Sequence, residues 1–106
     1  MSFLGKLMCD EECDDLIKDL IPWYLRSELE NLALLEVALS ERNFPLLIDL
    51  GDKMYGHGTS YGFPFISTLG KRIEIAAIQT DTNLLSSLLS ILKYYLKDTL
   101  KQHNLE

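Results

Sequence analysis

Apolar residues recur at helical spacing in four segments of the chain, and this periodicity constrains the fold more than any other feature. The segments cover about residues 22–40, 45–61, 64–77 and 82–101. Short turns separate them, and a proline suited to a first helical turn stands near the start of the first three. Four such helices predict an all-α fold, an antiparallel up-down-up-down four-helix bundle. A short acidic helix over residues 10–21 is expected to precede it.

Each segment has one face on which the apolar residues gather. In the second segment, Asn43 is the expected N-cap, Pro45 lies in the first turn, and the inward face is Leu47, Leu50, Gly51, Met54 and Gly58. In the third, Phe65 or Ile66 begins a stripe in which Gly70 allows close helix packing. In the fourth, the predicted core stripe is Leu84, Leu85, Leu88, Ile91, Leu92, Tyr95, Leu96 and Thr99.

Length and charge narrow the classes of protein that this chain can belong to. Its 106 residues suit one domain, expected over 1–104, with Leu105 and Glu106 interpreted as the remnant of a purification-tag junction. A formal charge of -6 without clustered Lys or Arg argues against a nucleic-acid partner. No apolar run approaches the roughly 20 residues that span a bilayer, and no secretory leader is evident. We therefore expect a cytoplasmic protein with no membrane partner.

The sequence also lacks the residue patterns of common catalytic and metal sites. Cys9 and Cys13 lie four apart with no histidine nearby, so we expect reduced thiols rather than a metal pair. No Ser-His-Asp, Cys-His, phosphate-loop or zinc spacing occurs. We expect no enzyme activity, no cofactor and no metal.

A glycine-rich stretch at residues 50–64 interrupts the helical pattern. Its sequence is Leu-Gly-Asp-Lys-Met-Tyr-Gly-His-Gly-Thr-Ser-Tyr-Gly-Phe-Pro. Interior glycines cost a helix roughly 1 kcal/mol each, which indicates that a surface approaches closely here. On a helix, Asp52, Tyr55, Gly56 and Thr59 share one face, with Ile48 beside them. The pattern predicts a docking surface for a partner.

This stretch resembles the central helix of histidine-containing phosphotransfer (HPt) domains, which carries His-x-Leu-Lys-Gly, then small residues, then Gly-Phe-Pro. Met54 matches the apolar position and Gly56 the glycine. The tail is matched by Gly58, Ser60, Tyr61, Gly62, Phe63 and Pro64. Downstream, residues 69–77 followed by Asp81 are similar to the next helix of that family. The resemblance implies the same four-helix architecture.

Two positions depart from the family pattern and change the expected function. Asp52 stands where the family has its phosphorylated histidine, and Tyr55 where it usually has a lysine. Phosphoryl relay needs an imidazole nitrogen as nucleophile, which a carboxylate does not supply. The resemblance thus implies a pseudo-HPt module that binds the receiver domain of a response regulator or a hybrid sensor kinase without accepting phosphate.

Two alternatives stay open. The first is an active phosphotransfer protein that uses His57. His57 lies five residues after Asp52, which places it about 140° further around the helix. The second is a structural or self-associating bundle without a signalling partner. Lys53 and His57 flank the docking surface, and Lys71 and Arg72 are candidate cations beside it, although solvated surface charge is the simpler interpretation of the cations.

Overall fold

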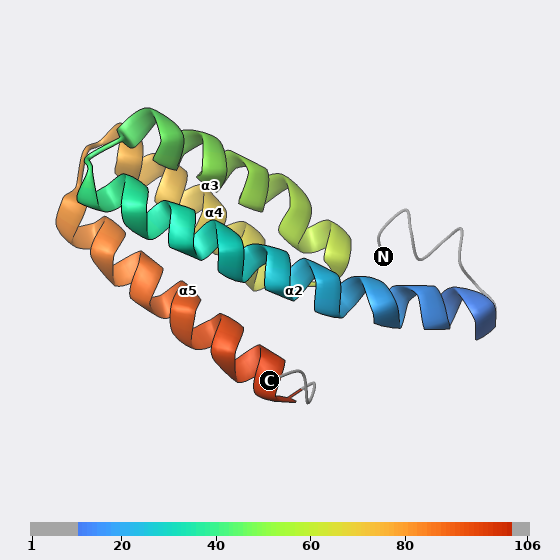
Figure 1. The fold of residues 1–106 in the computed structure, drawn as a ribbon. Coiled ribbons are helices and arrows are strands. Elements are labelled where there is room, and N and C mark those ends of the chain that lie inside the picture. Colours follow the sequence, from blue (N-terminus) through green and yellow to red (C-terminus); the bar gives the residue numbers. More distant parts are fainter. Residues whose placement is uncertain (1–10, 103–106) are drawn as a thin grey trace.

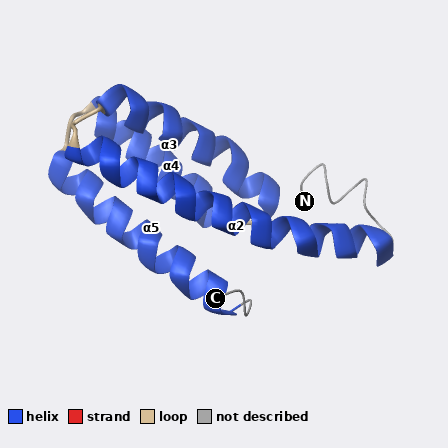
Figure 2. Cartoon of the chain, in the orientation of Figure 1, coloured by secondary structure: helices blue, strands red, loops and turns tan. Residues whose placement is uncertain are grey.

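The computed structural model describes residues 11–102 of the chain, with side chains from residue 20 onward. Within this part the backbone forms four α-helices, one 3-10 turn and no strand (Figure 1; Figure 2). The elements are α2 (Glu11–Ser40), α3 (Phe44–Gly58), η1 (Thr59–Tyr61), α4 (Pro64–Ile78) and α5 (Thr82–Gln102). The four helices pack around one apolar core, which confirms the all-α fold class.

The first helix is longer than predicted. A separate short helix over residues 10–21 is wrong, because α2 runs from Glu11 to Ser40 and carries Pro22 in its interior. An interior proline removes one backbone hydrogen bond and costs about 3 kcal/mol. That cost is confined to one turn, and the turns on either side keep the helix continuous. In Figure 1 the first turns of α2 extend past the ends of α3 and α4.

Polar side chains fix where two of the helices begin. The Oδ1 atom of Asn43 accepts a hydrogen bond from the backbone N–H of Leu46 at 3.2 Å, so the N-cap predicted for α3 is confirmed. At the start of α5, the Oδ1 atom of Asp81 accepts from the backbone N–H of Leu84 at 3.0 Å. The α2–α3 and α4–α5 connections lie at the same end of the molecule (Figure 1).

Both of these connections have a residue in the left-handed region at their second position. Arg42 (φ 54°) is the second residue after α2, and Thr80 (φ 53°) is the second after α4. The next backbone N–H then reaches back into the helix. Asp81 donates to the carbonyl of Ala76 at 3.0 Å, and Asn43 donates to the carbonyl of Ala38 at 2.8 Å. These are Schellman motifs, which usually place glycine at the left-handed position.

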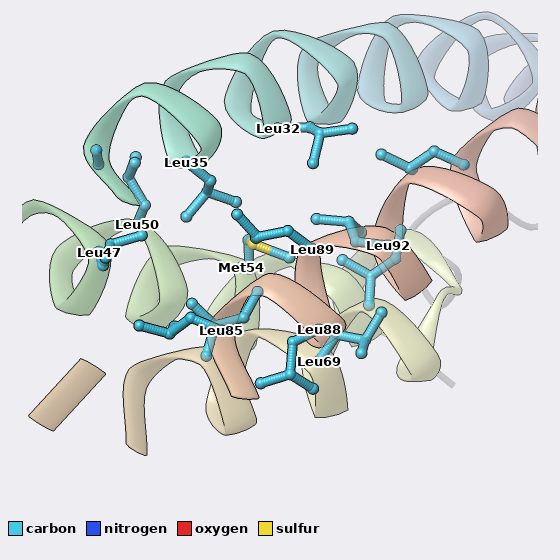
Figure 3. Packing of buried hydrophobic residues seen from close by; sticks show 14 of the residues in the cluster. Leu32, Leu35, Leu47, Leu50, Met54, Leu69, Leu85, Leu88, Leu89 and Leu92 are labelled. Carbon is cyan, nitrogen blue, oxygen red and sulfur yellow. The ribbon is translucent and has the colours of Figure 1, made fainter. Parts of the chain in front are cut away.

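The core draws side chains from all four helices. Figure 3 shows Leu35 of α2, Met54 of α3, Leu69 of α4 and Leu89 of α5 pointing into the shared interior. The predicted inward face of α3 is confirmed, since all five of its residues are buried. Ile66, the alternative to Phe65 in the third segment, is fully buried, and Phe65 is 42% exposed.

The predicted stripe of α5 is wrong at two positions. Leu84 and Ile91 are 43% and 46% exposed, whereas Leu89 and Leu100, which the prediction omitted, are buried. Leu84 and Ile91 lie seven residues apart and therefore share one face of the helix. That face is exposed to solvent, and the neighbouring face of α5, which carries Leu85, Leu89 and Leu92, packs into the core.

Candidate functional site

The predicted docking surface lies on the outer side of α3. Asp52, Tyr55, Gly56 and Thr59 are exposed, and Ile48 beside them is half-buried against the core. We call these five residues the docking face. Among the described residues, no atom lies within 4 Å of the position that a Cβ on Gly56 would occupy. Gly56 therefore leaves a shallow notch in the exposed side of the helix.

Closer approach occurs on the side of α3 next to Tyr55, where the helix meets α4. A Cβ built on Gly51 would lie 2.7 Å from the carbonyl oxygen of Gly70, and one built on Gly70 would lie 2.6 Å from that of Gly51. The backbones of α3 and α4 are thus in direct contact. The close packing expected of Gly70 is confirmed, and Gly51 is its counterpart on α3.

A buried serine on α4 joins this contact to the docking face. The hydroxyl of Ser67 accepts hydrogen bonds from the backbone N–H of Thr59 at 2.7 Å and from its side-chain hydroxyl at 3.0 Å. It donates to the carbonyl oxygen of Tyr55 at 2.9 Å. A Cβ on Gly58 would lie 2.6 Å from the same hydroxyl oxygen. Ser67 therefore fixes the backbone that carries Tyr55 and Thr59.

Sequence reasoning did not single out Ser67. The only feature in the sequence that could have drawn attention to Ser67 is that this polar residue directly follows the inward-facing Ile66. The residues that it binds lie eight and twelve positions earlier in the chain. No local pattern indicates such partners.

A cation of α4 lies against the docking face. The Nζ atom of Lys71 is 5.2 Å from the centre of the Tyr55 ring and 3.1 Å from the Oε1 atom of Glu74. The pKa of Lys71 is raised, first by its hydrogen bond to Glu74 and the charge of that carboxylate, and further by Tyr55 and Asp52. Glu74 is therefore the main partner of Lys71, and Asp52 contributes least to the shift.

A groove of about 610 Å³ runs from the docking face across α4 to α5. Its apolar walls come from α4 and α5, and both of its charged residues, Lys71 and Arg72, are cations. The lining residues are Tyr55, Thr59, Pro64, Ser67, Thr68, Lys71, Arg72, Ile75, Leu84 and Leu88. The groove therefore extends the docking face with an apolar surface that Arg72 and the ion pair of Lys71 with Glu74 border.

The flanking residues lie outside this groove. Lys53 is exposed and forms an ion pair with Asp49 at 3.1 Å on the same helix. His57 is exposed in the last turn of α3. His103 and Cys9 lie outside the described residues, as does the side chain of Cys13. Within the described part of the chain, no three metal-binding side chains gather, and no helix is long and apolar enough to cross a bilayer.

One buried polar pair was not predicted. Glu28 of α2 is 2% exposed, and its Oε2 atom has no hydrogen-bond partner among the described residues. Burial raises the pKa of Glu28, and the hydrogen bond that Glu28 accepts from Asn31 partly offsets the rise. The hydroxyl of Tyr24, also buried, likewise has no partner in the described part, and its ring stacks on Tyr61 at 4.3 Å. This pair lies in the core rather than on the docking face.

Comparison with known proteins gives no match: no family model fits the chain, and neither a curated protein nor a solved structure matches it.

Proposed function

We propose that the protein is a pseudo-HPt module, an up-down-up-down bundle that binds a receiver domain of a two-component system without accepting phosphate. The observation that carries this proposal is the common exposure of Asp52, Tyr55, Gly56 and Thr59 on the outer side of α3. Of these four, Gly56 matches the HPt pattern, and Asp52 and Tyr55 occupy the positions of its histidine and lysine. An exposed carboxylate beside an open glycine suits partner contact better than catalysis.

The proposed mechanism is occupancy of the receiver's binding surface. Asp52 stands where an HPt domain presents imidazole, so it meets the receiver's phosphorylation pocket with a carboxylate. That pocket is itself acidic, and two carboxylates at close range repel each other. A metal ion held by the receiver, or a nearby cation, lowers this repulsion.

Lys71 supplies such a cation. Its Nζ atom lies over the Tyr55 ring, and a lysine side chain is protonated at neutral pH. Arg72 and the apolar groove widen the contact area next to it. Receiver binding therefore depends on Gly56 for close approach, on Tyr55 for apolar contact and on Lys71 for charge balance.

The first test restores the missing nucleophile. Asp52→His, alone and with Tyr55→Lys, is incubated with receiver domains from the source cell that have been phosphorylated by phosphoramidate. We expect acid-labile label on the variants and none on the unmodified protein. The single variant matters because Tyr55→Lys would set a second cation beside Lys71. If every such receiver fails to label either variant, the proposed docking geometry is wrong.

The second test separates this proposal from relay through His57. The unmodified protein, His57→Gln and Asp52→Ala are each exposed to the same phosphorylated receivers. Label on the unmodified protein that disappears only in His57→Gln would show that His57 is the phosphoacceptor. We expect no label on any of the three.

The third test measures docking directly. Gly56→Ala adds a methyl group to the notch, where the described residues leave room for it in the free protein. We therefore expect weaker receiver binding by calorimetry without loss of stability. Glu30→Ala, at an exposed residue of α2 outside the docking face, is the control and should change binding little.

A further inference from the structure

A hollow of about 410 Å³ lies between the first turn of α4 and residues 90–98 of α5. A volume of about 300–1,000 Å³ is typical of ligand pockets. We call this site the aromatic hollow, because three of its lining residues are aromatic. It is lined by Phe65, Ser90, Ile91, Tyr94, Tyr95 and Asp98, and none of these residues lines the groove beside the docking face.

The aromatic residues of the hollow come from both helices. The rings of Phe65 on α4 and Tyr95 on α5 have their centres 4.8 Å apart and their planes inclined at 48°, so they meet at a corner instead of stacking flat. Tyr94, the preceding residue of α5, is 76% exposed, and its ring has room to turn toward a bound molecule. The face of an aromatic ring carries the negative part of its quadrupole. Three rings around one space therefore favour a cation.

The only charged residue in the lining is Asp98. It lies four residues after Tyr94 and three after Tyr95, on the same side of α5. Its Oδ2 atom accepts a hydrogen bond from the Nε2 atom of Gln102 at 3.0 Å. Asp98 forms no ion pair with any other described side chain. The aromatic hollow is therefore a negatively charged site whose carboxylate can pair with a cation from outside the chain.

The lysines of α5 do not occupy the aromatic hollow. Lys93 forms an ion pair with Glu36 of α2 at 4.0 Å. Lys97 and Lys101 are exposed, and neither lines the hollow. A divalent metal ion fits poorly, because such ions take about six to eight oxygen ligands and the lining side chains supply few oxygens. An organic ammonium ion suits the site better, since its methyl groups can contact the rings and Ile91 while its charge faces the rings and the carboxylate.

We propose that the aromatic hollow binds a small quaternary ammonium ion, with its trimethylammonium group among Phe65, Tyr94 and Tyr95 and its positive charge beside Asp98. Rings that are open to water contribute modestly, so the affinity comes from the three rings and the carboxylate together. This binding is separate from receiver docking, because the hollow and the groove share no lining residue. Loss of one function should leave the other unchanged.

Titration with choline chloride at constant ionic strength, followed by NMR of the aromatic side chains, tests the proposal. We expect saturable shifts of Phe65, Tyr94 and Tyr95 with a dissociation constant in the millimolar range. The uncharged analogue of choline, in which carbon replaces the nitrogen, has the same shape and should bind at least about fivefold more weakly. Asp98→Asn removes the charge and keeps the shape of the side chain, and should raise the dissociation constant for choline about threefold. The matched control is Asp49→Asn, at an exposed carboxylate of α3, which changes the net charge equally and should leave the constant unchanged.

Two variants at one position test the role of the rings. Tyr94→Leu removes a ring but keeps an apolar side chain, and should raise the dissociation constant for choline about threefold. Tyr94→Phe keeps the ring and should leave the constant unchanged. Both changes are made at a side chain that is 76% exposed, so the fold should be unaffected, which circular dichroism checks. The proposal is overturned by shifts that are absent or do not saturate, by equal binding of choline and its uncharged analogue, by equal effects of Asp98→Asn and Asp49→Asn, or by equal effects of Tyr94→Leu and Tyr94→Phe.

Discussion

The hydroxyl oxygen of Ser67 on α4 accepts a hydrogen bond from the backbone N–H of Thr59, 2.7 Å away at the end of α3. The same hydroxyl donates to the carbonyl of Tyr55 at 2.9 Å. One buried side chain thus pairs both a donor and an acceptor that the last turn of α3 leaves open. The two residues whose backbone it holds both belong to the docking face.

Ser67→Ala should therefore destabilise the protein by about 1–3 kcal/mol, because a part-buried N–H and a part-buried carbonyl lose their partner. Urea unfolding followed by circular dichroism measures the difference. Thr68→Ala is the matched control, since the exposed hydroxyl of Thr68 only donates to the Pro64 carbonyl within α4. Equal effects of the two changes would show that the Ser67 bonds add nothing to stability.

Alanine should have opposite effects at two glycines. In Gly70→Ala the new methyl would lie 2.6 Å from the Gly51 carbonyl oxygen, and the α3 backbone must move, at about 1–3 kcal/mol. In Gly56→Ala the methyl meets open space, and the higher helix propensity should stabilise by up to about 1 kcal/mol. The denaturant concentrations at the unfolding midpoints of both variants measure these changes in stability. A stabilising Gly70→Ala would contradict the backbone contact.

Glu28 should make stability depend on pH in a defined direction. Burial raises the pKa of Glu28 above its ordinary value, so the folded state holds this proton more tightly than the unfolded state. The stabilisation is complete below about 4.3, the value of an unperturbed glutamate, and is lost as pH rises through the higher folded pKa. Glutamine does not titrate, so Glu28→Gln should not lose this stabilisation. The unfolding free energy of Glu28→Gln minus that of the unmodified protein should therefore grow as pH rises from about 4.3 through the folded pKa of Glu28.

Unfolding curves of both proteins at a series of pH values measure this difference. Glu30→Gln, at an exposed carboxylate on the same helix, is the control and should show no comparable trend. A difference between Glu28→Gln and the unmodified protein that stays constant, or shrinks as pH rises, would mean that Glu28 is not buried as a protonated acid.

Thr80 is a β-branched residue with φ 53°, a conformation that its side chain disfavours. Thr80→Gly should relieve this strain and stabilise the protein by about 1 kcal/mol. Thr82→Gly, in the first turn of α5, should destabilise instead, because glycine weakens a helix. Thermal unfolding of the two variants distinguishes them. A lower melting temperature for Thr80→Gly would contradict the motif.

The helix boundaries could be predicted because local chemistry sets them. Asn43 caps α3, and prolines occupy the first turns of α3 and α4, as expected from the sequence alone. At Pro22 the prediction was wrong, because packing outweighs local chemistry there. The penalty of an interior proline is local, and the packing of residues after it sustains a single α2.

The faces of α5 were harder to assign. Apolar residues occupy two neighbouring sides of this helix, and periodicity alone does not show which side meets the core. Leu84 and Ile91 were assigned inward and face solvent. Ser67 and Glu28 could not be predicted either, because their importance depends on burial and on residues of other turns and helices.

The glycine contact between α3 and α4 has a consequence for motion. With Gly51 and Gly70 touching through their backbones, neither helix can slide or rotate without breaking the other's packing. Amide hydrogens of this pair should therefore exchange with solvent only on global unfolding, whereas those of the overhanging first turns of α2 exchange through local fraying. The outer side of α3 would then keep one shape on the timescale of an encounter with another protein.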